Sequence, residues 1–111
     1  MTSIYIYCDK MTDNYIEICI IDDYAIMQKH FIDSDNGKLF VSLLKEAFSD
    51  IKTKGAVVYR QYVMKNEYTD IIKNVVGWKL VKDDIDDDIV TLECSIDDAP
   101  ICIVQGLLYG Q

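Results

Sequence analysis

The sequence predicts an α+β fold in which one mixed β-sheet packs against two helices. Three observations lead to this fold class. The first third of the chain alternates apolar and polar residues, two later stretches have helical periodicity, and the end of the chain returns to alternation. The chain has 111 residues, and half of them are apolar. Residues 1–111 are therefore expected to form a single domain with one core.

Three strands are expected first, over residues 3–8, 15–21 and 24–32. β-branched and aromatic residues dominate all three, which is typical of strands. The links between them are short and polar, so the three strands are expected to form an antiparallel meander.

Two helices are expected next, at about 37–52 and 66–76, with a short buried strand at 56–59 between them. The apolar residues of the first helix recur along a single helical stripe, after N-cap candidates in the Asp-Ser-Asp run that begins at Asp33. In the second helix Asn66 is the expected N-cap, and Gly77 fits the end.

Strands over 78–81, 89–96 and 101–105 complete the expected order β-β-β-α-β-α-β-β-β. The last strand is apolar on both faces, which indicates an interior strand or one that a partner covers. If residues 97–99 form a hairpin loop, Cys94 lies opposite Cys102 and a disulfide between them is conceivable. The alternative is that all four cysteines are reduced thiols acting as small apolar residues.

No cofactor, metal ligand set or catalytic residue is predicted from sequence motifs. The cysteine spacings and the single histidine, His30, do not suit a zinc site. Asp84, Asp86 and Asp88 have the spacing that begins a calcium loop, but Ile89 and Ser95 replace the glycine and the glutamate that such a loop requires.

The negative charge is concentrated in one segment. The net charge is −8, from 19 acidic and 11 basic residues. Eight of the acids lie in residues 83–98, and the rest of the chain is electrically balanced. This distribution argues against direct nucleic-acid binding, which needs clustered Lys and Arg. Two interpretations remain open: a solvated loop that aids solubility, or a patch that steers a basic protein to the site.

The favoured hypothesis is a small acidic inhibitor that resembles immunity or anti-defence proteins in general character, and not an enzyme. It would dock its acidic segment on a basic protein partner, such as one that binds nucleic acid. Trp78 would supply an apolar anchor. The proposed partner-binding carboxylates are Asp83, Asp84, Asp86, Asp87, Asp88, Asp97 and Asp98.

Two expectations concern location and assembly. No apolar run is long enough for a membrane span, and the first residues lack a signal-peptide pattern, so a cytoplasmic location in a bacterium or a host cell is expected. The high apolar content and the doubly apolar last strand also suit a homodimer.

Over residues 3–82 the order of elements resembles the ribonuclease H-like fold. Asp9 ends the first strand and Glu46 lies in the first helix, where that family keeps two of its metal-binding acids. The fragments at 61–63 and 77–79 are also similar to that family. The resemblance implies, as the alternative function, a Mg²⁺-dependent nuclease. The chain departs from the family pattern because the fourth strand of that family ends in an acid, whereas residues 56–62 read AVVYRQY and contain none.

Overall fold

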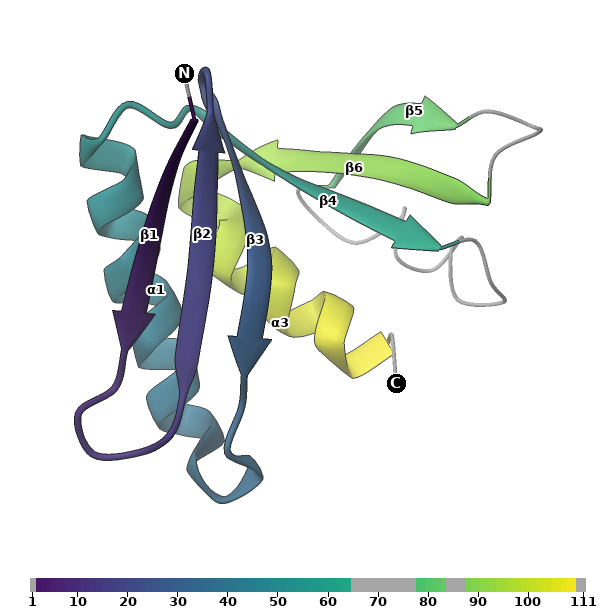
Figure 1. Cartoon of the computed structure of the whole chain (residues 1–111). Helices are drawn as coiled ribbons and strands as arrows, with labels where there is room; N and C mark the ends of the chain where they lie inside the picture. The colour runs from purple at the N-terminus through teal and green to yellow at the C-terminus, as the bar shows by residue number, and fades with distance from the viewer. Residues whose placement is uncertain (1, 65–77, 84–87, 110–111) are drawn as a thin grey trace.

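The structure is a computed structural model that describes residues 2–64, 78–83 and 88–109. Within these residues a six-stranded mixed sheet has the strand order β1-β2-β3-β4-β6-β5 (Figure 1). The strands are β1 (Thr2–Cys8), β2 (Tyr15–Ile21), β3 (Tyr24–Phe31), β4 (Val58–Met64), β5 (Lys79–Asp83) and β6 (Ile89–Ser95). The helices are η1 (Ser34–Asn36), α1 (Gly37–Thr53), η2 (Ile96–Asp98) and α3 (Ala99–Tyr109).

The first three strands form the antiparallel meander that their alternation predicts. β1 pairs with β2 from Thr2↔Ile21 to Cys8↔Tyr15, and β2 pairs with β3 across the tight turn at Asp22. Asp22 adopts a positive φ of 56°, which an aspartate tolerates better than most residues in a two-residue hairpin turn.

Helix α1 then crosses over and returns the chain to β4, which lies parallel to β3. A parallel neighbour requires such a crossover, because a tight turn can only reverse the chain direction. The buried side of α1 includes Phe40, Leu44 and Phe48, which pack in the same core as Ile16 and Ile18 of β2.

Both long helices cover the same face of the sheet (Figure 1). Helix α3 contacts α1, and its Cys102 and Ile103 join the core beside Leu92 of β6. At the edge of the sheet the Tyr7 hydroxyl donates to Asp50 Oδ2 over 2.6 Å, which ties β1 to α1. The core therefore lies between one face of the sheet and a single layer of helices.

The predicted last strand, 101–105, is wrong, because these residues lie in helix α3. Ser95 precedes η2 as its N-cap and accepts a hydrogen bond from the Asp98 amide, while Asp97 and Asp98 lie in its first turn. Pro100 lies near the start of a helix. The first amides of a helix have no carbonyl partner within it, so the amide hydrogen that proline lacks costs no hydrogen bond. The prediction failed because residues 101–105 are a short, continuous apolar run, and such a run has no periodicity that distinguishes a buried strand from a buried helix.

The observed order among the described residues is therefore three strands, α1, three strands and α3, in place of the predicted β-β-β-α-β-α-β-β-β. The predicted helix at 66–76 lies outside the described residues. Neither of the two long helices that the structure describes has the length and hydropathy to cross a bilayer.

The two glycines that flank α1 differ in backbone conformation, and this gives a matched test of the helix boundaries. Gly55 has φ = 100°, and its amide donates to the Lys52 carbonyl at the end of the helix. Gly37 has φ = −59°, within the ordinary helical range. An added Cβ would meet no atom within 4 Å at either position, so only the backbone preference distinguishes them.

We predict that Gly55→Ala lowers the free energy of unfolding by about 1 kcal/mol, because alanine is strained at positive φ. Gly37→Ala should leave stability unchanged or raise it by up to about 1 kcal/mol. Urea denaturation followed by circular dichroism measures both. Equal effects of the two substitutions would contradict this assignment of the helix end.

Candidate functional site

The parallel strands β3 and β4 are joined at one end only. Two residue pairs connect them, Tyr24↔Val58 and Ala25↔Tyr59. Just before β4, the Val57 amide donates to the Asp23 carbonyl over 2.8 Å. Beyond these contacts the strands diverge (Figure 1), so the facing edges of residues 26–31 and 60–63 form no ladder with each other. Main-chain edges of this kind can pair with an extended ligand.

Tyr59 lies at the inner end of this divergence. Its ring packs edge-on against Phe48 of α1, with the centroids 5.3 Å apart, and tilts against Trp78. Its hydroxyl lies 3.4 Å from Oε1 of Gln61 on β4 and also makes a hydrogen bond with the backbone of Met27 on β3. The Tyr59 side chain therefore bridges the two strands where they part.

Burial raises the pKa of the Tyr59 phenol well above its ordinary value of 10.0, and the hydrogen bond with Met27 only partly opposes this. The phenol is consequently protonated at physiological pH. It can act as a hydrogen-bond donor and cannot act as a base.

Strand β3 carries a β-bulge in its diverging part. Glu17 of β2 pairs with Lys29 and Ile18 pairs with Met27, so Gln28 is the extra residue. A bulge bends the strand and redirects its main-chain groups, and bulges are common beside active sites. Here the bulge follows directly on Met27, the residue whose backbone meets Tyr59.

The N-terminal end of α1 follows β3 and offers amide donors. Its N-cap, Asn36, makes no side-chain cap, and its first turn contains Lys38 and no acid. The first amides of a helix without a cap attract anions, aided by the helix dipole. The nearby Asp33 carboxylate already accepts hydrogen bonds from the Asp35 amide and from Asn36 Nδ2, at 3.1 and 2.9 Å.

Asn14 fixes this helix end against the sheet. Its side chain is only 1% exposed. Its Oδ1 accepts from the Asp33 amide over 2.6 Å, and its Nδ2 donates to the Asn36 carbonyl over 3.3 Å. Asn14 precedes β2, so these two bonds link the start of that strand to the turn that leads into α1.

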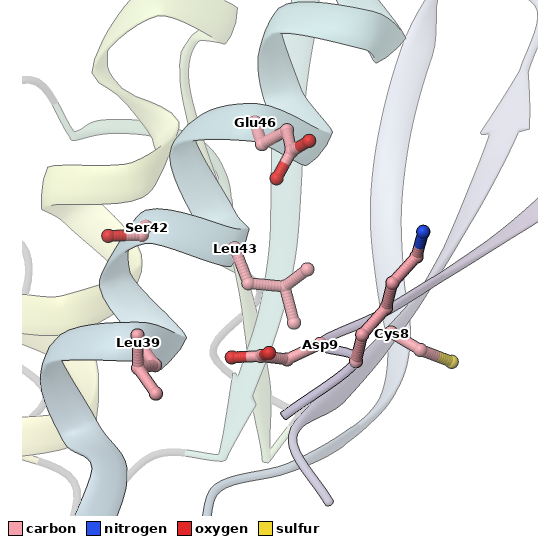
Figure 2. A pocket seen from close by; sticks show the side chains of 7 residues that line it. Cys8, Asp9, Leu39, Ser42, Leu43 and Glu46 are labelled. Atoms are coloured by element: carbon pink, nitrogen blue, oxygen red, sulfur yellow. The ribbon is translucent and has the colours of Figure 1, made fainter. Parts of the chain in front are cut away.

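A separate pocket lies between the end of β1 and the outer side of α1 (Figure 2). Its volume is about 330 Å³. Asp9 and Glu46, the two acids that the ribonuclease H-like resemblance singled out, both line it, and Leu43 lies between them in the view of Figure 2. No group of three potential metal-binding side chains occurs among the described residues. This pocket therefore has two carboxylates and no complete set of metal ligands.

The structure gives several of the predicted partner-binding residues local roles. Asp97 Oδ1 lies 2.8 Å from Lys52 Nζ, and Asp98 Oδ2 accepts from the Ser95 hydroxyl over 3.0 Å. Trp78 is 8% exposed and belongs to the core. Asp83 ends β5, and Asp88 is exposed just before β6. Asp84, Asp86 and Asp87 lie outside the described residues.

Cys94 and Cys102 do meet, although not across a hairpin. Cys94 is on β6 and Cys102 is on α3, which packs beneath that strand. Their hydrogen bond, together with burial, raises the pKa of the Cys94 thiol. The four cysteines, all of them among the described residues, form no disulfide.

Comparisons with known proteins identify the fold. No family model and no curated protein sequence matches the chain. Among solved structures, a protein described as an acyl-CoA N-acyltransferase from Klebsiella pneumoniae matches with a TM-score of 0.54 at 12% identity, over 86% of this chain and 72% of its own. An N-acetyltransferase from Thermoplasma acidophilum, solved with coenzyme A, matches with a TM-score of 0.51 at 26% identity, over 74% of this chain and 52% of its own.

A ribosomal-protein-alanine N-acetyltransferase from Escherichia coli matches with a TM-score of 0.51 at 14% identity, over 75% of this chain and 61% of its own. The chain has the acyl-CoA N-acetyltransferase (GNAT) fold. It spans between about half and three-quarters of the length of these three proteins.

These comparisons correct two predictions. The resemblance to the ribonuclease H-like fold is wrong, because the solved structures that match are consistently described as acyl- or acetyltransferases. The same finding contradicts the prediction of an immunity-like or anti-defence inhibitor. The acidic segment is conspicuous in the sequence, whereas the divergence of β3 and β4 has no sequence signature. The only available signal was the crossover order strand, helix, strand.

We predict that Asn14→Ala lowers the free energy of unfolding by about 1–3 kcal/mol, because it removes two hydrogen bonds of a buried side chain and leaves the partly buried Asp33 amide without its acceptor. Asn36→Ala is the control, since it removes a single bond to the Asp33 side chain and should cost under about 1 kcal/mol. Urea unfolding measures both. An Asn14→Ala protein as stable as the wild type would show that this link does not hold the start of α1.

Proposed function

We propose that the chain binds an acyl-coenzyme A where β3 and β4 diverge and transfers its acyl group to an amine. One observation carries the proposal: two parallel strands joined by only two residue pairs, in a fold whose solved examples are N-acetyltransferases. The Thermoplasma acidophilum protein, the most similar in sequence of those three, contains coenzyme A.

The described residues suit the two chemically distinct parts of coenzyme A. The pantetheine arm is extended and carries amides, which can pair with the main-chain edges of β3 and β4 beyond Ala25 and Tyr59. The phosphates need amide donors and positive charge, which the N-terminal end of α1 and Lys38 supply. Asp35 opposes phosphate binding by its charge, so we expect Lys38 to be important for affinity.

When bound, an acyl-CoA supplies a thioester, whose acyl carbon bonds to the amine nitrogen as the carbon–sulfur bond breaks, with the amine proton passing to the leaving thiolate. The chain's own residues position and shield this reaction. Tyr59 holds the inner end of the divergence together, because its hydroxyl donates to Gln61 of β4 and also makes a hydrogen bond with the backbone of Met27 on β3. The bulge at Gln28 redirects the main chain of β3 beside it. Because acyl-CoA thioesters are abundant in the cytoplasm, that location remains the proposed one.

We predict that the wild-type protein binds coenzyme A and acetyl-CoA in isothermal titration calorimetry, and that Lys38→Glu raises the dissociation constant by roughly tenfold. Lys45→Glu is the matched control on the same helix. It makes the same change of charge about 10 Å further along, beyond the Debye length of about 8 Å, so its effect should be at most about twofold.

Transfer is tested by incubating the protein with acetyl-CoA and a mixture of amino acids, polyamines and peptides, and by measuring the release of the coenzyme A thiol. Release that depends on both the protein and an amine supports the proposal. The absence of any calorimetric binding at millimolar coenzyme A would refute it. Equal weakening by Lys38→Glu and Lys45→Glu would show that the phosphates do not bind at the start of α1.

A further inference from the structure

The face of the sheet opposite α1 and α3 is apolar and, among the described residues, no helix covers it (Figure 1). The register places alternate residues of β1, β2 and β3 on this open face, because Tyr5, Tyr7 and Ile18 point to the helices. Residues paired across the strands share a face, which extends the same assignment to β4 and β6. The exposed apolar side chains of the open face are Ile4, Ile6, Tyr15, Phe31, Tyr62, Met64 and Ile89.

An apolar surface of this kind marks an interaction site in a protein that remains in solution. At the usual strand spacing of about 4.8 Å and rise of about 3.3 Å per residue, β1, β2 and β3 span roughly 300 Å², and all six strands span about 600 Å². A standard interface buries about 800 Å² of each partner, and specific, stable interfaces begin at about 600 Å². The whole open face, with β4, β5 and β6 included, therefore reaches the lower end of that range.

The described charges on the open face nearly cancel, because Lys29, Arg60 and Lys79 stand against Glu17 and Glu93, although the chain as a whole has a net charge of −8. Glu17 of β2 lies opposite Lys29 of β3 in the register. Arg60 Nε contacts Glu93 Oε2 over 2.9 Å, and Arg60 also lies over the Tyr24 ring. The open face therefore has no large net charge that would attract a strongly charged partner. A second acidic copy of the same chain meets the least repulsion when it approaches by this face.

We infer that the open face is the interface between two copies of this chain, packed sheet to sheet about a two-fold axis. A two-fold axis sets the same patch against itself, so Glu17 of one copy can face Lys29 of the other. The apolar residues of β1, β2 and β3 then fill the centre of the interface, as in two sheets that pack about 10 Å apart. This inference goes beyond the proposed acyl transfer: Phe31 and Tyr62 of the open face also lie on the diverging parts of β3 and β4, but the argument for the interface uses neither coenzyme A nor the start of α1.

Sedimentation equilibrium and light scattering over a range of concentrations test the interface. The wild type is expected to be a dimer. Ile6→Glu, which puts a charge on the open face, should raise the dimer dissociation constant by roughly thirtyfold or more. Ile101→Glu is the matched control, because Ile101 lies on α3 in the helical layer and has a similar exposure, 57% against 63% for Ile6. It should leave the dimer unchanged.

A charge exchange separates loss of the interface from misfolding. Lys29→Glu alone and Glu17→Lys alone should each weaken the dimer, and mixing the two variants should restore it, because Glu17 and Lys29 are neighbours within one copy and opposite charges in the mixture meet only between copies. Circular dichroism verifies that each variant is folded. If Ile6→Glu does not fold, the charge exchange decides the matter.

Three results would overturn the inference. The first is a wild type that is monomeric at all concentrations. The second is a dimer that Ile101→Glu dissociates and Ile6→Glu does not. The third is a dimer that neither Lys29→Glu nor Ile6→Glu weakens, which would place the interface on another surface.

Discussion

The contact between β3 and β4 is the constraint on which the rest of the molecule depends. It is the only parallel pairing among the described strands, and two residue pairs make it. It exists because α1 leaves the end of β3, runs back along the sheet and delivers β4 to the neighbouring position. The position of α1, of the turn before it and of the diverging edges all follow from this crossover.

The divergence is stable because each strand has a complete ladder on its other side. β4 pairs with β6 along its whole length, from Val58↔Ser95 to Met64↔Ile89, and β3 pairs with β2 through the bulge at Gln28. Each strand therefore satisfies about half of its main-chain groups without the other, and the groups on the facing edges beyond Ala25 and Tyr59 are the ones that a ligand can pair with. Tyr59 and Phe48 fill the space beneath the point where the strands part, and the buried Tyr59 hydroxyl is satisfied there by Gln61 and Met27.

The sequence predicts the locally determined parts of this structure. Periodicity and turn residues place β1, β2, β3 and α1 within one or two residues, because their patterns are long and amphipathic. The same reasoning fails for 101–105, where an apolar run hides the difference between strand and helix. It cannot show that β6 inserts between β4 and β5, because that order depends on contacts distant in sequence.

The candidate site is harder to predict than the fold. Asn14 and Tyr59 are isolated residues whose importance comes from burial and from partners far away in the chain. Asp9 and Glu46, which the ribonuclease H-like resemblance singled out, line a pocket away from the diverging strands. The acidic segment is conspicuous in sequence, yet two of its members, Asp97 and Asp98, form contacts within the chain at the start of α3. Composition indicates where charge lies and does not indicate what it contacts.

Amide chemical shifts recorded during a titration with coenzyme A test the central claim most directly, since they locate the ligand residue by residue. Binding at the divergence predicts the largest shifts at Met27–Phe31 of β3, at Arg60–Val63 of β4 and at the first amides of α1. Shifts confined to the pocket of Asp9 and Glu46, or no shifts at saturating coenzyme A, would contradict it.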